Sequence, residues 1–164
     1  MKDPIFQRVS VRKFTDAPVT DEQVERLLRA AMAAPSATNQ QPWEFYVVRD
    51  PEKLMELSRC HEYSMCVKNA TLALVPCYRK EARHPEYLHL DLSAATENIL
   101  LEAVQMGLGG TWLGIAPVPD RMAKMREILD LPEGLEAFAI VPLGQPERDK
   151  PRQDRYDPSR VHTL

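Results

Sequence analysis

The chain has 164 residues, of which 44% are hydrophobic and 27% charged, with a formal net charge of −3. This composition fits one globular domain and excludes a largely disordered chain, a membrane-spanning helix and general nucleic-acid binding. The N-terminal sequence MKDPIFQRVSVRKF lacks the apolar stretch and small-residue cleavage site of a secretory signal. We therefore expect a single cytoplasmic domain over 1–164.

The first half of the chain predicts two helices and two strands. Thr20 and Gln23 have the spacing of a capping box at the start of the first helix, and a proline ends it. Asp50 and Pro51 suit the N-cap and first position of the second helix. Helical periodicity and runs of β-branched and aromatic residues predict helices over 21–34 and 51–59 and strands over 45–49 and 71–78.

The second half contains the longest predicted helix, 86–106, which ends at Gly107. Alanines and leucines lie on several of its faces, so we expect protein on most sides of it. From Gln145 the chain is polar and proline-rich, which predicts an extended arm over 145–164. A long apolar helix and an extended tail together indicate a homodimer. The other predicted elements are a strand over 111–115, a helix from Pro119 and a strand over 135–144.

Short strands among helices predict an α+β or α/β layered fold. Three cysteines, Cys60, Cys66 and Cys77, occur without a CxxC spacing, which predicts free buried thiols and no zinc site. Scattered histidines predict no metal site either. The motifs GxxxxGK[ST], GxGxxG and GxSxG are absent, so an enzyme with this sequence must take its chemistry from an organic cofactor. Glu97 and Glu102 are expected to be solvated or ion-paired.

Three separated segments carry the functional prediction. In RVSVRKF (8–14), two arginines four residues apart with a serine between them can bind a phosphate; a solvated basic end is the alternative. APSATNQQPW (34–43) has short polar side chains that suit a polar ligand edge, or an ordinary loop. In GLGGTWLGI (107–115), glycines let the backbone approach a flat ligand. A tight turn would explain Gly107 and Gly109, but Gly114 less well.

Together these segments resemble the FMN-dependent nitroreductase family in its short, single-domain form. The order RxSxR(K)F, APSxxNxQPW, GLGxxWLG and an arginine-containing tail after LGxP extends over nearly the whole chain. The resemblance implies an α+β fold in which a mixed sheet is flanked by helices. It also implies an intertwined homodimer with exchange of the C-terminal arms, and two FMN molecules at the interface, each contacted by both chains.

The resemblance implies three groups of FMN-binding residues. In the first group, Arg8, Ser10 and Arg12 bind the phosphate and ribityl chain, and Val9 makes a backbone contact. Arg155 adds a second cation from the arm, with Arg160 as the alternative. The second comes from the partner chain or lines the ring edge: Pro35, Ser36, Ala37 and Asn39. The third backs the isoalloxazine ring, with one backbone N–H toward the flavin N5: Trp112, Leu113 and Gly114.

The function implied is an FMN-dependent NAD(P)H oxidoreductase. A reduced nicotinamide would transfer hydride to the flavin N5 and leave, and a nitroaromatic, quinone or similar acceptor would then be reduced at the same place. One shared site predicts ping-pong kinetics, and hydride transfer needs no catalytic side chain. Residues 60–69 and 79–90 are expected to shape an open acceptor pocket. The alternatives are reductive dehalogenation or flavin breakdown on the same fold, a non-catalytic flavin-binding dimer, and a domain that binds an unrelated phosphate.

Overall fold

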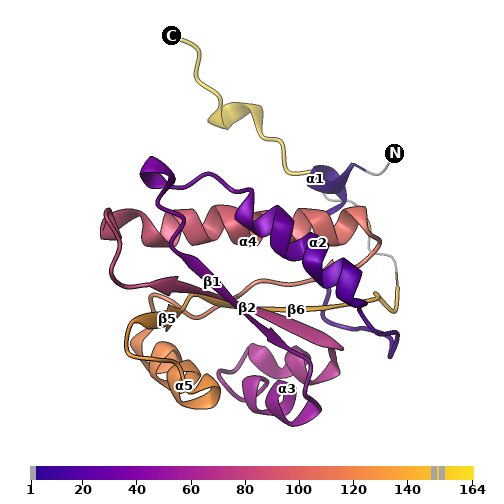
Figure 1. The fold of residues 1–164 in the computed structure, drawn as a ribbon. Coiled ribbons are helices and arrows are strands. Elements are labelled where there is room, and N and C mark those ends of the chain that lie inside the picture. The colour runs from indigo at the N-terminus through magenta and orange to yellow at the C-terminus, as the bar shows by residue number, and fades with distance from the viewer. Residues whose placement is uncertain (1–2, 149–150, 152–153) are drawn as a thin grey trace.

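A computed structural model describes residues 3–148, 151 and 154–164. Its centre is a six-stranded sheet with the order β1-β2-β6-β3, in which β4 also pairs with β6 and β5 with β2 (Figure 1). All named strand pairs are antiparallel, and an isolated parallel bridge joins Ser10 to Gly110. The strands are β1 (Trp43–Val48), β2 (Leu72–Arg79), β3 (Gly109–Gly110), β4 (Leu113–Gly114), β5 (Leu135–Ala137) and β6 (Ala139–Gly144).

Helices cover both faces of the sheet, with α2 and α4 on one side and α3 and α5 on the other (Figure 1). The expected α+β architecture of a sheet flanked by helices is therefore confirmed, whereas the expected mixed sheet is antiparallel at every named strand pair. The α-helices are α1 (Pro4–Gln7), α2 (Asp21–Met32), α3 (Pro51–Leu57), α4 (Leu88–Gln105) and α5 (Pro119–Leu129). Short 3-10 helices are η1 (Ala37–Asn39), η2 (Ser64–Asn69), η3 (Pro85–Tyr87) and η4 (Pro158–Arg160). None of the helices in the described part of the chain is long and apolar enough to cross a membrane.

Strand β2 is buried on both faces because its side chains alternate between two hydrophobic cores. Leu72 and Leu74 pack in the core with α2 and α4, whereas Ala73, Val75 and Cys77 pack in the core with α3 and α5. This double burial explains the continuous apolar run in its sequence. Cys60, Cys66 and Cys77 are all free and buried, as predicted.

Local signals place the ends of the predicted helices. The Thr20–Gln23 capping box is present at the start of α2, and the Asp50 side chain accepts a hydrogen bond from the Glu52 N–H at the start of α3. Gly107 adopts a φ of 78° after α4, a conformation that favours glycine. The helices and strands themselves therefore follow the sequence pattern closely.

Two predicted strands differ from the structure. The predicted strand 111–115 is replaced by the short strands β3 and β4, which both pair with β6. The predicted strand 135–144 is divided into β5 and β6 at Phe138, whose N–H donates to the Pro76 carbonyl at 2.8 Å. Helix α1 was not predicted. Within the proposed arm 145–164, residues 149–150 and 152–153 lie outside the described residues.

Candidate cofactor-binding site

The first motif lies between α4 and β3. Arg8 follows α1, and its Nε lies 3.4 Å from the Glu97 carboxylate of α4. The Val11 N–H donates to the Gly110 carbonyl at 2.9 Å, beside the bridge from Ser10 to Gly110. Val9 is half-buried and packs against the small core that contains Val11. The structure therefore joins the arginine motif to the glycine motif, although about a hundred residues separate them in the sequence.

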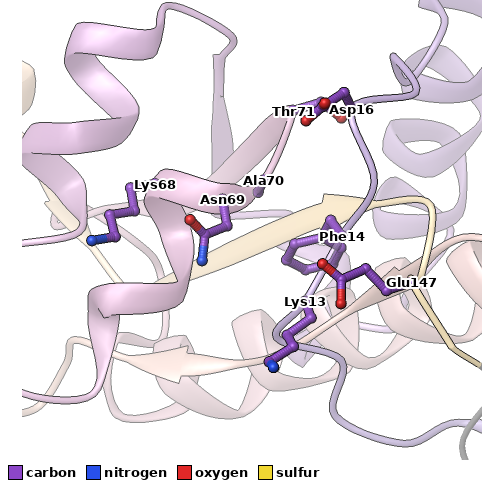
Figure 2. Close-up of a pocket in the computed structure, with 8 residues that line it drawn as sticks. All are labelled: Lys13, Phe14, Asp16, Lys68, Asn69, Ala70, Thr71 and Glu147. Carbon is purple, nitrogen blue, oxygen red and sulfur yellow. The ribbon is translucent and has the colours of Figure 1, made fainter.

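Two cavities next to this segment are lined in part by positively charged side chains. One, of about 330 Å³, is lined by Arg12 and Arg148 among other residues. The other, of about 400 Å³, is lined by Lys13 and Lys68 and by the two acidic residues Asp16 and Glu147, among others (Figure 2). Lys13 and Glu147 line both cavities. This surface has the guanidinium and ammonium groups that an anionic ligand requires.

Arg12 also affects Cys66, a thiol of the core that contains α3 and α5. Burial raises the pKa of Cys66, and the positive charge of Arg12 opposes that rise. The side chain of Arg12 is itself exposed to solvent. An exposed guanidinium beside a cavity is available to bind a ligand.

The second motif forms a loop with an unusual backbone. Thr38, Asn39 and Gln41 all have positive φ, between 46° and 57°, a region that side chains rarely adopt. Within the loop, the Ser36 hydroxyl accepts a hydrogen bond from the Gln41 N–H at 3.0 Å. Pro35 and Asn39 are exposed, and Ser36 and Ala37 are half-buried. The loop thus presents short polar groups to the surface.

Three outside groups hold this loop. The buried carboxylate of Asp91, on α4, accepts hydrogen bonds from the Ala37 N–H at 2.9 Å and from Gln40 Nε2 at 2.7 Å. The Gln40 side chain also bonds to both backbone groups of His84. Arg79 Nη2 donates to the Gln41 carbonyl at 2.6 Å. Asp91, Gln40 and Arg79 were not singled out from the sequence, because their partners are 38 to 54 residues away.

The glycines of the third motif have different surroundings. A Cβ at Gly109 would lie 2.7 Å from Val11, and one at Gly110 would lie 2.8 Å from Leu143, so close packing requires glycine at both positions. A Cβ at Gly114, by contrast, would meet no atom within 4 Å. Packing within the chain therefore does not account for glycine at 114, whereas the close approach of a ligand would.

Around Gly114, the neighbouring groups fix the backbone. Arg121 Nη1, on α5, donates to the Gly114 carbonyl at 2.9 Å, a contact with no signal in the sequence. Trp112 is half-buried and stands edge-on to Phe138, with 5.6 Å between ring centroids. The Leu113 side chain is buried in the core with α3 and α5, so only its backbone is available to a ligand. Gly114 thus lies at the surface on a supported strand.

Within one chain, the first and second motifs lie on different parts of α4. Asp91, which holds the loop, and Glu97, which pairs with Arg8, are separated by about 9 Å along the helix axis and about 120° around it. Figure 1 accordingly shows α1 and the 35–41 loop near opposite ends of α4. The yellow C-terminal arm, which carries the exposed Arg155, extends away from the body. Arg160 pairs with Asp157 at 3.1 Å.

Comparison with known proteins identifies a family and solved structures of the same fold. The model of the family described as "Nitroreductase family" matches residues 5–70 and 63–145. A protein of Archaeoglobus fulgidus, described provisionally as an NADH dehydrogenase or NAD(P)H nitroreductase, is 43% identical over 163 residues, which span 96% of this chain and 94% of the relative.

Two solved structures are similar over almost the whole chain. An FMN-dependent nitroreductase from Clostridium difficile has a TM-score of 0.91 and 31% identity, with 98% of this chain and 96% of that chain covered. The NADPH:FMN oxidoreductase of Vibrio harveyi, in a complex with NAD+, has a TM-score of 0.85 and 29% identity, with 98% and 75% covered.

Proposed function

This chain belongs to the nitroreductase family, and we propose that it is an FMN-dependent NAD(P)H oxidoreductase that reduces nitroaromatic, quinone or similar electrophilic acceptors. The observation that carries the proposal is the open surface at Gly114, where an added Cβ would meet no atom within 4 Å although an Arg121 contact fixes the backbone. Such a surface suits a flat ring that lies against the backbone.

The residues present fit FMN in their chemistry. Arg8 and Arg12 supply guanidinium groups beside the Ser10 hydroxyl, and guanidinium binds phosphate oxygens through two parallel hydrogen bonds. Val9 adds a backbone contact, and Arg155 adds a cation from the arm. Trp112, Leu113 and Gly114 back the ring. When bound, FMN supplies the hydride chemistry, while the chain binds and orients it and no side chain needs to act as an acid.

In this proposal, the second motif of one protomer completes the FMN site of the other. Because α4 separates the 35–41 loop from the arginine segment within one chain, Pro35, Ser36, Ala37 and Asn39 are best placed to contact an FMN held by a second copy. Exposed apolar side chains on α1 and the arm, Ile5, Phe6, Tyr156 and Val161, would be covered in a homodimer with exchanged arms. Residues 1–164 then form one domain, of which 145–164 are the arm. Free buried thiols favour a cytoplasmic location.

The visible spectrum of the purified protein tests the proposal. We expect a flavin band that bleaches when NADH or NADPH is added without oxygen and returns when a quinone or nitroaromatic is added. Initial rates against both substrates should give parallel lines in double-reciprocal plots, because donor and acceptor use one site in turn. A flavin band that neither nucleotide bleaches would refute the oxidoreductase, and failure to bind added FMN would refute the cofactor.

A further inference from the structure

The 35–41 loop holds most of the backbone strain in the described part of the chain. Among the described residues other than glycine, four have positive φ. Three of these, Thr38, Asn39 and Gln41, lie in the loop, and the fourth, Asp130, caps α5. A strained backbone of this kind persists only where surrounding groups determine it. The shape of the loop must therefore depend on the groups that hold it.

Asp91 is the buried group among those that hold the loop. It is 4% exposed, on a helix whose other buried side chains are almost all apolar. Each of its carboxylate oxygens accepts one hydrogen bond, Oδ1 from the Ala37 N–H and Oδ2 from the Gln40 side chain. A carboxylate can only accept hydrogen bonds, and charge strengthens the bonds that it makes.

Gln40 has a fixed orientation because of its other partners. Its Oε1 accepts from the His84 N–H at 2.9 Å, and its Nε2 donates to the His84 carbonyl at 3.1 Å as well as to Asp91. Turning the amide over would place oxygen against the oxygens of both Asp91 and His84. The Gln40 amide therefore requires an acceptor at position 91, and a carboxylate provides it.

We propose that Asp91 is a positioning residue that sets the flavin-binding shape of the 35–41 loop through Ala37 and Gln40, without touching the flavin itself. This inference rests on the proposed function, in which the loop completes the FMN site of a second protomer. Because Asp91 lies in α4, the shape of the loop is tied to the helix that also pairs with Arg8 through Glu97.

Asp91→Asn tests this role with almost no change in volume. The asparagine oxygen can still accept from the Ala37 N–H, but its amide group would face the Nε2 of Gln40, donor against donor. The route through Gln40 is tested by comparing D91N in the wild type with D91N in a Gln40→Ala background, because the donor–donor contact cannot form where the Gln40 amide is absent. Glu102→Gln is the matched control. It also removes a carboxylate charge from α4, but Glu102 pairs with Arg26 and not with the loop.

The readout is the dissociation constant of FMN from reconstituted protein, measured by flavin fluorescence, with amide exchange of residues 36–41 in the flavin-free protein. We expect D91N to weaken FMN binding about 10- to 100-fold and to speed the exchange of Ala37. D91N should weaken FMN binding much less in the Gln40→Ala background than in the wild type, and Glu102→Gln should bind as the wild type does.

The outcomes separate this inference from the proposed function. Wild-type affinity in a folded D91N protein would overturn the role of Asp91 and leave the proposed function intact. An equal loss from D91N in the wild-type and Gln40→Ala backgrounds would overturn the route through Gln40. Failure of the wild-type protein to bind FMN at all would overturn both the proposed function and this inference.

Discussion

Replacing Gly114 with alanine separates the function of this position from its packing. The new Cβ would meet no atom within 4 Å, and Gly114 is not a positive-φ glycine. Alanine also restricts the unfolded chain more than glycine does, so the free energy of unfolding should stay unchanged or rise by up to about 1 kcal/mol. Gly134→Ala is the matched control, because a Cβ at Gly134 also meets nothing within 4 Å.

The expected cost of Gly114→Ala is in activity. A methyl group about 1.5 Å from the Cα would push back a ring lying against this backbone by a distance on the order of 1 Å. Misplacement of that size can lower a rate about 100-fold. Anaerobic stopped-flow measurement of flavin reduction by NADH or NADPH should therefore show a loss of that order in Gly114→Ala and none in Gly134→Ala.

Stability measurements complete the comparison. At Gly109 the added Cβ would lie 2.7 Å from Val11 Cγ2, so Gly109→Ala should destabilise the protein by about 1–3 kcal/mol in urea unfolding. Wild-type rates of flavin reduction and wild-type FMN affinity in Gly114→Ala would refute the reasoning, because they would show that no ligand approaches this surface.

Three further predictions follow from other groups. Burial raises the pKa of the Cys77 thiol from 9.0 to about 12, so above pH 9 the thiol ionises first in the unfolded state and the free energy of unfolding falls. Between pH 8 and 10, the wild type should lose about 1.4 kcal/mol more of this free energy than Cys77→Ala in urea unfolding. Equal pH dependences of the two proteins would contradict this prediction. Arg12→Ala should weaken FMN binding about 10- to 100-fold in fluorescence titrations; an equal loss in Arg29→Ala, a surface arginine paired with Glu25, would show a nonspecific effect. Deletion of residues 154–164 should shift the protein from dimer to monomer in sedimentation, and an unchanged dimer would exclude arm exchange.

The sequence predicts those elements whose signals are local. The Thr20–Gln23 cap and the apolar stripe identify α2, and Gly107 identifies the end of α4. The four residues of α1 are too few to show a helical period, so this helix could not be predicted. The break at Phe138 depends on a hydrogen bond to the Pro76 carbonyl of another strand, which no pattern near Phe138 reveals.

The same distinction applies to the candidate site. Arg8, Ser10 and Arg12 could be nominated because the types and spacing of their side chains are visible in the sequence. Glu97 and Glu102 were expected to be solvated or ion-paired, and the structure shows the ion-paired alternative, with Arg8 and Arg26 as partners. Asp91 looks like another polar residue of the same helix, and its role follows only from contacts with Ala37 and Gln40.

Two acidic residues of α4 contact both parts of the proposed site, the arginine segment and the 35–41 loop. Glu97 pairs with Arg8 beside the proposed phosphate-binding segment, and Asp91 holds the loop that would reach a second protomer. The helix that carries them packs against α2 and the sheet through side chains that are fully buried, including Leu92 and Ile99. A site supported by a packed helix keeps its geometry better than one supported by loops alone. A shift of α4 would therefore disturb both the proposed phosphate-binding segment of its own chain and the loop that the proposal assigns to a second protomer.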